Sequence, residues 1–282
     1  MIAVTGATGG IGGEVVRLLL EASQQVRVLV RQPEKAAALR GRAEVVQADL
    51  LKPETLPAAF AGATKAFVLV GTISDIPAAA GPIFQAAERA GVRHVVFVSS
   101  GTIEIEPPTT VGRWHLEGEK HLKATSMGWT MLRPGNFASN TLRWAGPIKS
   151  QGAVFAPHGQ HRTAVIDPRD IAAVAAKALT SPGHEQKTYV LTGPKPITTE
   201  EQVSSLAAVL GKPLRFVEVP EAGARAGMLK AGMGELLADA VLELQRPGRA
   251  MRQELTTTVA DVTGRAPRSF DEWARDHAAA FA

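Results

Sequence analysis

Short apolar runs recur along the chain, and most are followed by a segment with helical spacing. The runs are rich in Val, Leu and Phe and are nearly continuous rather than alternating, which is typical of parallel strands covered by helices on both faces. Between them, apolar positions return every three or four residues, as in residues 76–90. This pattern predicts an α/β fold with a doubly wound parallel sheet. The first predicted strands are residues 2–5, 26–30, 43–47, 65–70, 94–98 and 129–133.

A glycine-rich turn joins the first predicted strand to the first predicted helix. In such a turn, Gly6 would let the chain bend sharply, Gly9 would let the backbone approach a pyrophosphate, and Gly12 would let the helix pack close to the sheet. The free amides at the start of the helix would face the phosphates. The alternative is a strand-to-helix turn that binds nothing. The predicted phosphate-binding residues are Gly6, Thr8, Gly9, Gly10, Ile11 and Gly12.

The end of the second predicted strand bears on the choice of cofactor. Sites for the unphosphorylated dinucleotide place Asp or Glu here, whereas an arginine can pair with a 2′-phosphate. This chain has Arg31 at that position and Lys35 one turn later. We therefore expect NADPH rather than NADH, the alternative being that Arg31 is an ordinary solvated arginine.

The other strand ends supply further candidate contacts. Ligands of such sheets bind beyond the carboxyl ends of the strands, so the residues that follow each strand should line one crevice. Asp49 would cap the following helix, touch the adenine edge, or do both. The predicted cofactor-binding residues at these ends are Asp49, Leu50, Val70, Gly71, Thr72, Ser99, Ser100, Pro134 and Gly135.

The pattern also predicts two lobes. Residues 152–161 are loop-rich and are expected to leave the sheet, residues 163–166 are expected to form a strand, and residues 188–192 to return to the sheet. The composition changes after residue 193, where a smaller, mostly helical lobe is expected on the substrate side. The predicted dinucleotide-binding domain comprises residues 1–135 and 164–193, and the smaller lobe residues 136–163 and 194–282.

The smaller lobe carries clear helix signals. Thr198 with Glu201, and Ser269 with Glu272, have the spacing of capping boxes. Residues 220–245 are predicted as one or two helices that contain methionines and glycines. They would form either an adaptable lid over an apolar substrate or an amphipathic surface packed on the rest of the protein.

Composition excludes several classes of function. The 282 residues carry a net charge of +4 without a basic block, so no nucleic-acid partner is expected. The absence of cysteine excludes disulfides and cysteine metal sites, and His158 and His161 alone make a poor metal site. No apolar run approaches membrane-spanning length and no signal peptide is evident. We expect a cytoplasmic protein, as a monomer or homodimer, with a small apolar or aromatic substrate and no metal.

An ordered set of motifs points to a family. The chain resembles the atypical short-chain dehydrogenases of the NmrA-like, NAD(P)-binding type, a group that includes triphenylmethane reductases and type-2 quinone oxidoreductases. The resemblance implies a Rossmann domain and NAD(P)H-dependent reduction, with the turn at Pro134 and Gly135 beside the nicotinamide. The motifs are residues 4–12 (VTGATGGIG), 98–100 (VSS), 114–119 (WHLEGE), 132–137 (LRPGNF), 167–172 (DPRDIA), 189–194 (YVLTGP) and 263–267 (TGRAP).

The chain departs from ordinary short-chain dehydrogenases in its candidate acid. Those enzymes use a tyrosine and a lysine four residues apart, but the only tyrosine here, Tyr189, lies in a predicted strand. In the equivalent predicted helix, residues 111–125, His115 and Glu119 share a face. His115 would donate a proton, with Glu119 fixing its orientation and raising its pKa. The alternatives are a surface ion pair or a histidine that packs on the nicotinamide.

The missing tyrosine also narrows the acceptor. A simple ketone needs immediate protonation after hydride transfer, whereas quinones, conjugated enones, imines or iminium ions and cationic dyes are less demanding. Asn136 would orient the carboxamide or the substrate, or serve only the turn. Phe137, Leu142, Trp144 and the region of Met127 would be pocket walls or simply core.

Two functions follow from these observations. The first is an NADPH-dependent reductase of an apolar conjugated acceptor, with His115, Glu119 and Asn136 as the catalytic candidates. The second is a non-catalytic NADP(H) redox sensor, because the resembled group includes regulatory binding proteins. An epimerase acting on nucleotide sugars is disfavoured because it would need the missing tyrosine.

Overall fold

The computed structural model of the chain describes residues 1–246 and 255–282. Its largest sheet contains seven strands, which are β1 (Ile2–Thr5), β2 (Val26–Val30), β3 (Glu44–Gln47), β4 (Lys65–Val68), β5 (His94–Val98), β6 (Gly128–Pro134) and β9 (Lys187–Leu191). All neighbouring strands are parallel, in the order β3-β2-β1-β4-β5-β6-β9. The chain reverses its direction of travel across the sheet between β1 and β4, and such switch points are where ligands of α/β sheets bind.

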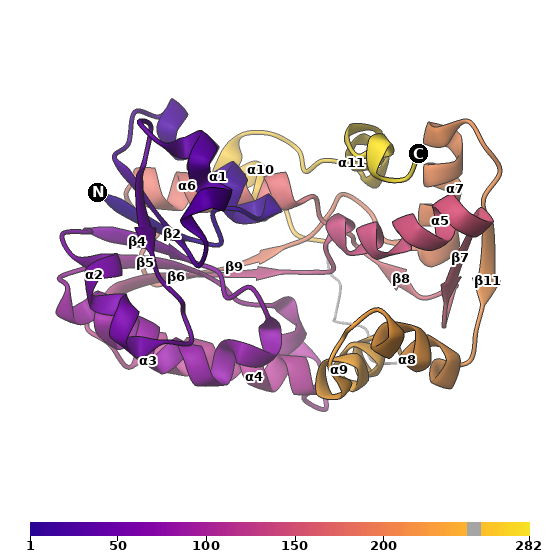
Figure 1. The fold of residues 1–282 in the computed structure, drawn as a ribbon, viewed down its shortest axis with the longest axis horizontal. Helices are drawn as coiled ribbons and strands as arrows, with labels where there is room; N and C mark the ends of the chain where they lie inside the picture. Colours follow the sequence, from indigo (N-terminus) through magenta and orange to yellow (C-terminus); the bar gives the residue numbers. More distant parts are fainter. Residues whose placement is uncertain (247–254) are drawn as a thin grey trace.

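Helices cover both faces of this sheet, which confirms the predicted doubly wound α/β fold (Figure 1). On one face, Leu19 and Ile171 belong to a single apolar core with Val259. On the other face, Phe84 and Phe97 meet edge to face at 5.4 Å within a second core. The first face carries α1 (Gly10–Glu21), α6 (Pro168–Thr180) and α10 (Thr258–Thr263), and the second α2 (Leu56–Phe60), α3 (Ile76–Arg89) and α4 (Thr110–Lys123).

Several connections are short 3₁₀ helices. Residues 53–61, which include two prolines, form a 3₁₀ turn followed by the short α2. None of the helices in the described ranges is long and apolar enough to cross a membrane. The 3₁₀ helices are η1 (Pro33–Leu39), η2 (Pro53–Thr55), η3 (Ile73–Asp75), η4 (Gly101–Glu104), η5 (Ala138–Trp144) and η6 (Ala278–Ala280).

A second group of elements lies at the carboxyl ends of the central strands (Figure 1). A third apolar core, with Trp144, Val203 and Trp273, joins η5 to two helices of this group. Both predicted capping boxes are present, at Thr198 and at Ser269. The helices are α5 (Ala145–Gln151), α7 (Thr199–Leu210), α8 (Glu221–Lys230), α9 (Glu235–Gln245) and α11 (Phe270–Asp276), and the strands are β7 (Ala153–Ala156), β8 (Arg162–Thr163), β10 (Ile197–Thr198) and β11 (Arg215–Glu218).

One expectation for this region is wrong, and one strand was not foreseen. The segment 152–161 is loop-rich as expected, but it also contains β7, which runs parallel to β11 and buries Val154 completely. The strand expected at 163–166 is limited to β8, which pairs with β10. The lobe boundaries stay a prediction, and α10, which lies within 194–282, packs against α6 beside the large sheet.

The glycine-rich turn has the geometry that its sequence predicts. Gly6 has φ +64°, in the left-handed region that favours glycine, and its carbonyl accepts a hydrogen bond from the Gly9 amide at 2.9 Å. A Cβ on Gly12 would lie 2.2 Å from the Gly6 oxygen, whereas a Cβ on Gly10 would meet nothing within 4 Å. The close approach of α1 to the end of β1 therefore depends on Gly12.

Gly12→Ala should destabilise the protein by about 1–3 kcal/mol, the usual range for forcing extra atoms into a packed site. Gly10→Ala is the matched control in the same helix turn and should change the free energy of unfolding little. Urea denaturation without cofactor measures both. Equal stabilities of the two variants would show that the turn relaxes around the added methyl group.

Candidate active site

A cavity of about 490 Å³ opens beyond the carboxyl ends of β4, β5 and β6. Its volume is in the range of small-molecule sites. The walls come from both groups of elements, since η5, α4, α7 and α9 contribute to it together with the strand ends. The predicted site residues that line it are Gly71, Thr72, Ser99, Ser100, His115, Gly135 and Asn136.

The predicted phosphate-binding residues lie at the start of α1 and are not in the cavity wall. Thr8, Gly9 and Gly10 are exposed, while Ile11 and Gly12 are buried against the sheet. No side chain in the described ranges caps α1. The amides of its first turn are therefore available to an anion, as a pyrophosphate site requires.

The remaining predicted cofactor residues sit at neighbouring strand ends. Arg31 and Lys35 are both exposed, after β2 and in η1, and neither has an ion-pair partner among the described residues. Asp49 Oδ1 accepts a hydrogen bond from the Leu51 amide at 3.1 Å, so Asp49 supports its own turn. Leu50 is half-buried, and Val70 and Pro134 are buried.

Glu119 is a fully buried carboxylate with several partners. Arg133 donates to both of its oxygens, from Nε at 2.9 Å and Nη2 at 2.8 Å. Ser99 Oγ donates to Oε1 at 2.7 Å, and Lys123 Nζ lies 3.6 Å from Oε2. Burial by itself raises the pKa of Glu119, but these partners outweigh it, and the pKa lies below its usual range. Glu119 is therefore an ionised anchor between α4, β5 and β6.

The expected pairing of His115 with Glu119 is wrong. His115 is only 5% exposed, and its Nδ1 lies 2.9 Å from the Val111 carbonyl oxygen. Because a carbonyl can only accept, Nδ1 carries the proton, and Nε2 is left to accept. Burial lowers the pKa of His115, and this outweighs the hydrogen bond to Val111 and the charge of Glu119. The ring is therefore a neutral acceptor near pH 7, and the surface ion pair is excluded.

The segment after β6 supplies one wall of the cavity. The Asn136 side-chain oxygen accepts a hydrogen bond from Asn140 Nδ2 at 2.7 Å, and Asn136 lines the cavity. Phe137 and Trp144 line it as predicted. Leu142 and Met127 do not: Leu142 is 39% exposed to solvent, and Met127 belongs to the core beneath α3.

The structure adds residues that the sequence analysis did not select. Arg143, His161 and Gln202 all line the cavity. Asn136, Asn140 and Arg143 recur every three or four residues, and that spacing is the signal that could have identified Arg143. His158 and His161 belong to no group that could hold a metal ion, because no cluster of three potential ligands occurs among the described residues.

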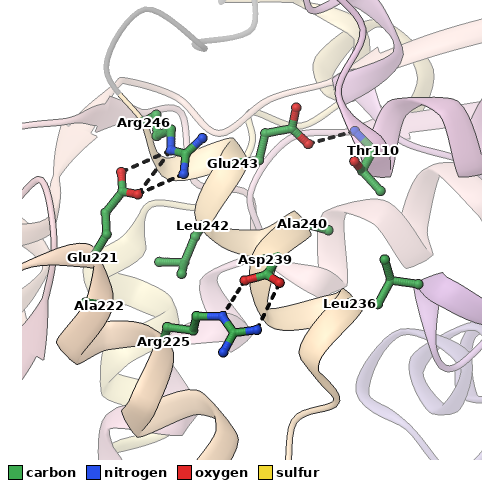
Figure 2. Close-up of a pocket in the computed structure, with 10 residues that line it drawn as sticks. All are labelled: Thr110, Glu221, Ala222, Arg225, Leu236, Asp239, Ala240, Leu242, Glu243 and Arg246. Atoms are coloured by element: carbon green, nitrogen blue, oxygen red, sulfur yellow. Dashed lines mark hydrogen bonds and ion pairs between the residues drawn. The ribbon is translucent and has the colours of Figure 1, made fainter.

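A second hollow of about 390 Å³ lies between α8, α9 and the start of α4 (Figure 2). Four of its five charged groups form ion pairs with one another. Arg225 Nε lies 2.6 Å from Asp239 Oδ1, and Arg246 Nη2 lies 3.0 Å from Glu221 Oε2. These ion pairs connect α8 to α9 and leave little charge for a ligand.

The same hollow explains the position of α9. Glu243 Oε2 accepts a hydrogen bond from the Thr110 amide at 2.9 Å, which ties α9 to the first residue of α4 (Figure 2). Leu237, Val241 and Leu244 recur every three or four residues and line the main cavity. Polar contacts on one side of α9 therefore hold its apolar side as a cavity wall.

Comparison with known proteins agrees with this architecture. Residues 6–182 match the model of a family described as NAD(P)H-binding. The chain belongs to this NAD(P)H-binding family. An NAD(P)H azoreductase of Xenophilus azovorans is 41% identical to it over 284 residues, covering 100% of this chain and 99% of the relative.

Two further proteins resemble the chain over almost their whole length. The (4-alkanoyl-5-oxo-2,5-dihydrofuran-3-yl)methyl phosphate reductase of Streptomyces griseus is 39% identical over 285 residues, covering 100% of this chain and 99% of the relative. The NADPH-dependent quinone oxidoreductase of Escherichia coli, solved with NADPH, has a TM-score of 0.85 at 27% identity and covers 98% of this chain and 99% of that one. The predicted NmrA-like, NAD(P)-binding relationship is confirmed.

Glu119→Gln should lower the free energy of unfolding of this NAD(P)H-binding protein by about 1.5–3 kcal/mol, the range for a hydrogen bond to a charged group, because Arg133 would keep only the partly exposed Glu104 as a counter-charge. Since the folded-state pKa of Glu119 lies below the unfolded value of 4.5, its contribution is full above pH 4.5 and is lost on further acidification. Glu117→Gln is the control, because Glu117 is half exposed and pairs with His121 on the same helix. Equal losses in the two variants, measured by urea denaturation at pH 7, would contradict the assignment.

Proposed function

We propose that this protein is an NADPH-dependent reductase of a conjugated acceptor such as a quinone, an azo compound or an enone. The general activity, that of an NAD(P)H-dependent oxidoreductase, is supported by the family and by the reductases that resemble the chain over their full length. The choice of a conjugated acceptor is supported mainly by the cavity, whose apolar walls lie beside the strand ends predicted to hold the nicotinamide.

The residues at the strand ends fit a phosphorylated dinucleotide. The uncapped start of α1, with exposed Gly9 and Gly10, suits a pyrophosphate. Arg31 and Lys35 suit a 2′-phosphate, since both are exposed and have no ion-pair partner in the described ranges. When bound, the nicotinamide supplies the hydride. The proposed role of Gly71, Thr72 and Gly135 is to hold it at the edge of the cavity.

The acceptor would lie between the nicotinamide side and α9. The lining is apolar and partly aromatic, with Val111, Phe137, Trp144, Met233 and Leu237. Such walls exclude water from a flat ring system and orient it for transfer. Asn136 is proposed to fix the orientation of the carboxamide or of the acceptor through its amide.

We propose that His115 orients the acceptor and does not protonate it. Its Nδ1–H is fixed on the Val111 carbonyl, so the neutral ring offers only the acceptor Nε2. Glu119 acts at a distance, because it holds Ser99 at the rim of the cavity through a 2.7 Å hydrogen bond. The proton that completes the reduction is then assigned to water. This suits acceptors whose reduced form is delocalised and disfavours simple ketones.

Consumption of NADPH by the purified protein across quinones, azo compounds and conjugated enones tests this function. We expect turnover with at least one class of acceptor and a lower kcat/KM with NADH than with NADPH.

Arg31→Asp should cut kcat/KM for NADPH by about 10- to 100-fold, the effect of losing a charged hydrogen bond, and should leave kcat/KM for NADH little affected. Saturable NADPH binding without any turnover would instead support the redox-sensor alternative.

His115→Leu should lower kcat by about 3- to 10-fold, the effect of losing one neutral hydrogen bond, with NADPH affinity unchanged. Because the pKa of His115 lies below 6.5, wild-type kcat/KM should stay level near pH 6.5 and fall only at lower pH, as the ring gains a proton. The variant should lack that acid limb. Wild-type activity that rises as the pH drops through 6.5 would identify His115 as a proton donor and contradict the assignment.

A further inference from the structure

The described side chains that line the cavity include a positively charged group but no negatively charged one. The described lining residues include one arginine, Arg143, and three histidines, but no aspartate or glutamate. The carboxylate of Glu221 is paired with His158 at 3.0 Å and with Arg246. One guanidinium and no carboxylate among the described lining side chains favour an anionic ligand over a cationic one.

Arg143 differs from the other crowded arginines of the chain. Arg133 is paired with Glu119 and Glu104, and Arg27 with Glu44. Arg143 has neither an ion pair nor a side-chain hydrogen bond with any described residue. Its guanidinium carries five N–H donors, and without a protein acceptor among the described residues these donors can bind an anionic ligand.

The position of Arg143 makes its guanidinium accessible to a ligand. Arg143 is an exposed residue whose side chain lines the cavity, and crowding by protein atoms lowers the pKa of its guanidinium. The side chain is therefore accessible to a ligand in the cavity as well as to solvent. Partial desolvation strengthens the attraction between such a charge and an anion.

Neutral donors line the same cavity. Gln202 is only 4% exposed, and its side-chain amide has no hydrogen-bond partner in the described part of the chain. Burial lowers the pKa of His161, and the neighbouring His158 lowers it further, so this ring is a neutral donor near pH 7. η5 and α7, which carry Arg143 and Gln202, meet in one apolar core. A tetrahedral or planar oxyanion has enough acceptor oxygens to bind the side chains of Arg143 and Gln202.

We propose that the cavity selects acceptors that carry an acidic substituent, such as a sulfonate, carboxylate or phosphate, and that Arg143 pairs with this group. The proposal rests on the proposed reductase function and adds the charge of its substrate. The aromatic part of the acceptor lies against Phe137, Trp144 and α9, and the acidic group lies on the Arg143 side. Cationic acceptors are disfavoured for the same electrostatic reason.

Binding to the NADP⁺-loaded protein tests the charge preference without any turnover. Naphthalene-2-sulfonate and the neutral naphthalene-2-sulfonamide form a matched pair for calorimetric titration. Arg143→Gln should weaken sulfonate binding by about 10- to 100-fold, the range for a hydrogen bond to a charged group, and change sulfonamide binding by less than about threefold. Arg143→Lys should retain part of the preference, because it keeps the charge but not the bidentate fork.

Arg89→Gln is the control for net charge. Arg89 is an exposed arginine in the last turn of α3, outside the cavity, so its loss should affect neither ligand. A loss of sulfonate binding equal to that of Arg143→Gln would mean that the whole protein's field, not Arg143, attracts the anion. Equal weakening of both naphthalenes by Arg143→Gln would assign Arg143 to packing and overturn the proposal.

Turnover separates this inference from the proposed function. For 1,4-naphthoquinone-2-sulfonate, Arg143→Gln should lower kcat/KM by about 10- to 100-fold, while kcat/KM for 1,4-naphthoquinone should stay within about threefold. If the wild type reduces both quinones and the variant changes both equally, the inference fails and the reductase function stands. If the wild type reduces no acceptor but its sulfonate preference depends on Arg143, the function fails and the anion site stands.

Discussion

The buried Glu119 carboxylate is the contact on which the site depends most. It accepts hydrogen bonds from Ser99 Oγ and from Nε and Nη2 of Arg133, and so joins α4 to the ends of β5 and β6. A lone buried carboxylate would be strongly unfavourable, and only this set of donors makes it stable. Because α4 also carries His115 and Val111, this ion pair helps to fix their position relative to the strand ends, together with the packing of α4 on α3.

Local sequence signals predicted the sheet and its glycine turn because their causes are local. Gly12 follows from a backbone contact six residues away at Gly6, and the strands follow from continuous apolar runs. The capping boxes at Thr198 and Ser269 are equally local. The strand β7 was missed because its partner, β11, lies about 60 residues later in the chain, and no local pattern records that pairing.

In the candidate site, the spacing of residues along a helix was not enough to predict which side chains form contacts. Four residues of helical separation placed His115 and Glu119 on one side of α4, but Arg133, from β6, takes the carboxylate, and Val111 takes the imidazole. Competition among partners from different elements decides such contacts, and the sequence does not rank them. The spacing could have pointed to Arg143, but only the packed structure shows that its side chain has no partner among the described residues.

The cavity is assembled from two sources that can change independently. The strand ends belong to the sheet and are constrained by its register, whereas η5 and α9 lie outside the sheet, and α9 is held by polar contacts on the side away from the cavity. Substitutions at Arg143, Met233 or Leu237 can therefore alter the cavity wall without moving the strand ends. Such a division offers a structural route by which one scaffold could diversify into reductases of unlike acceptors during evolution.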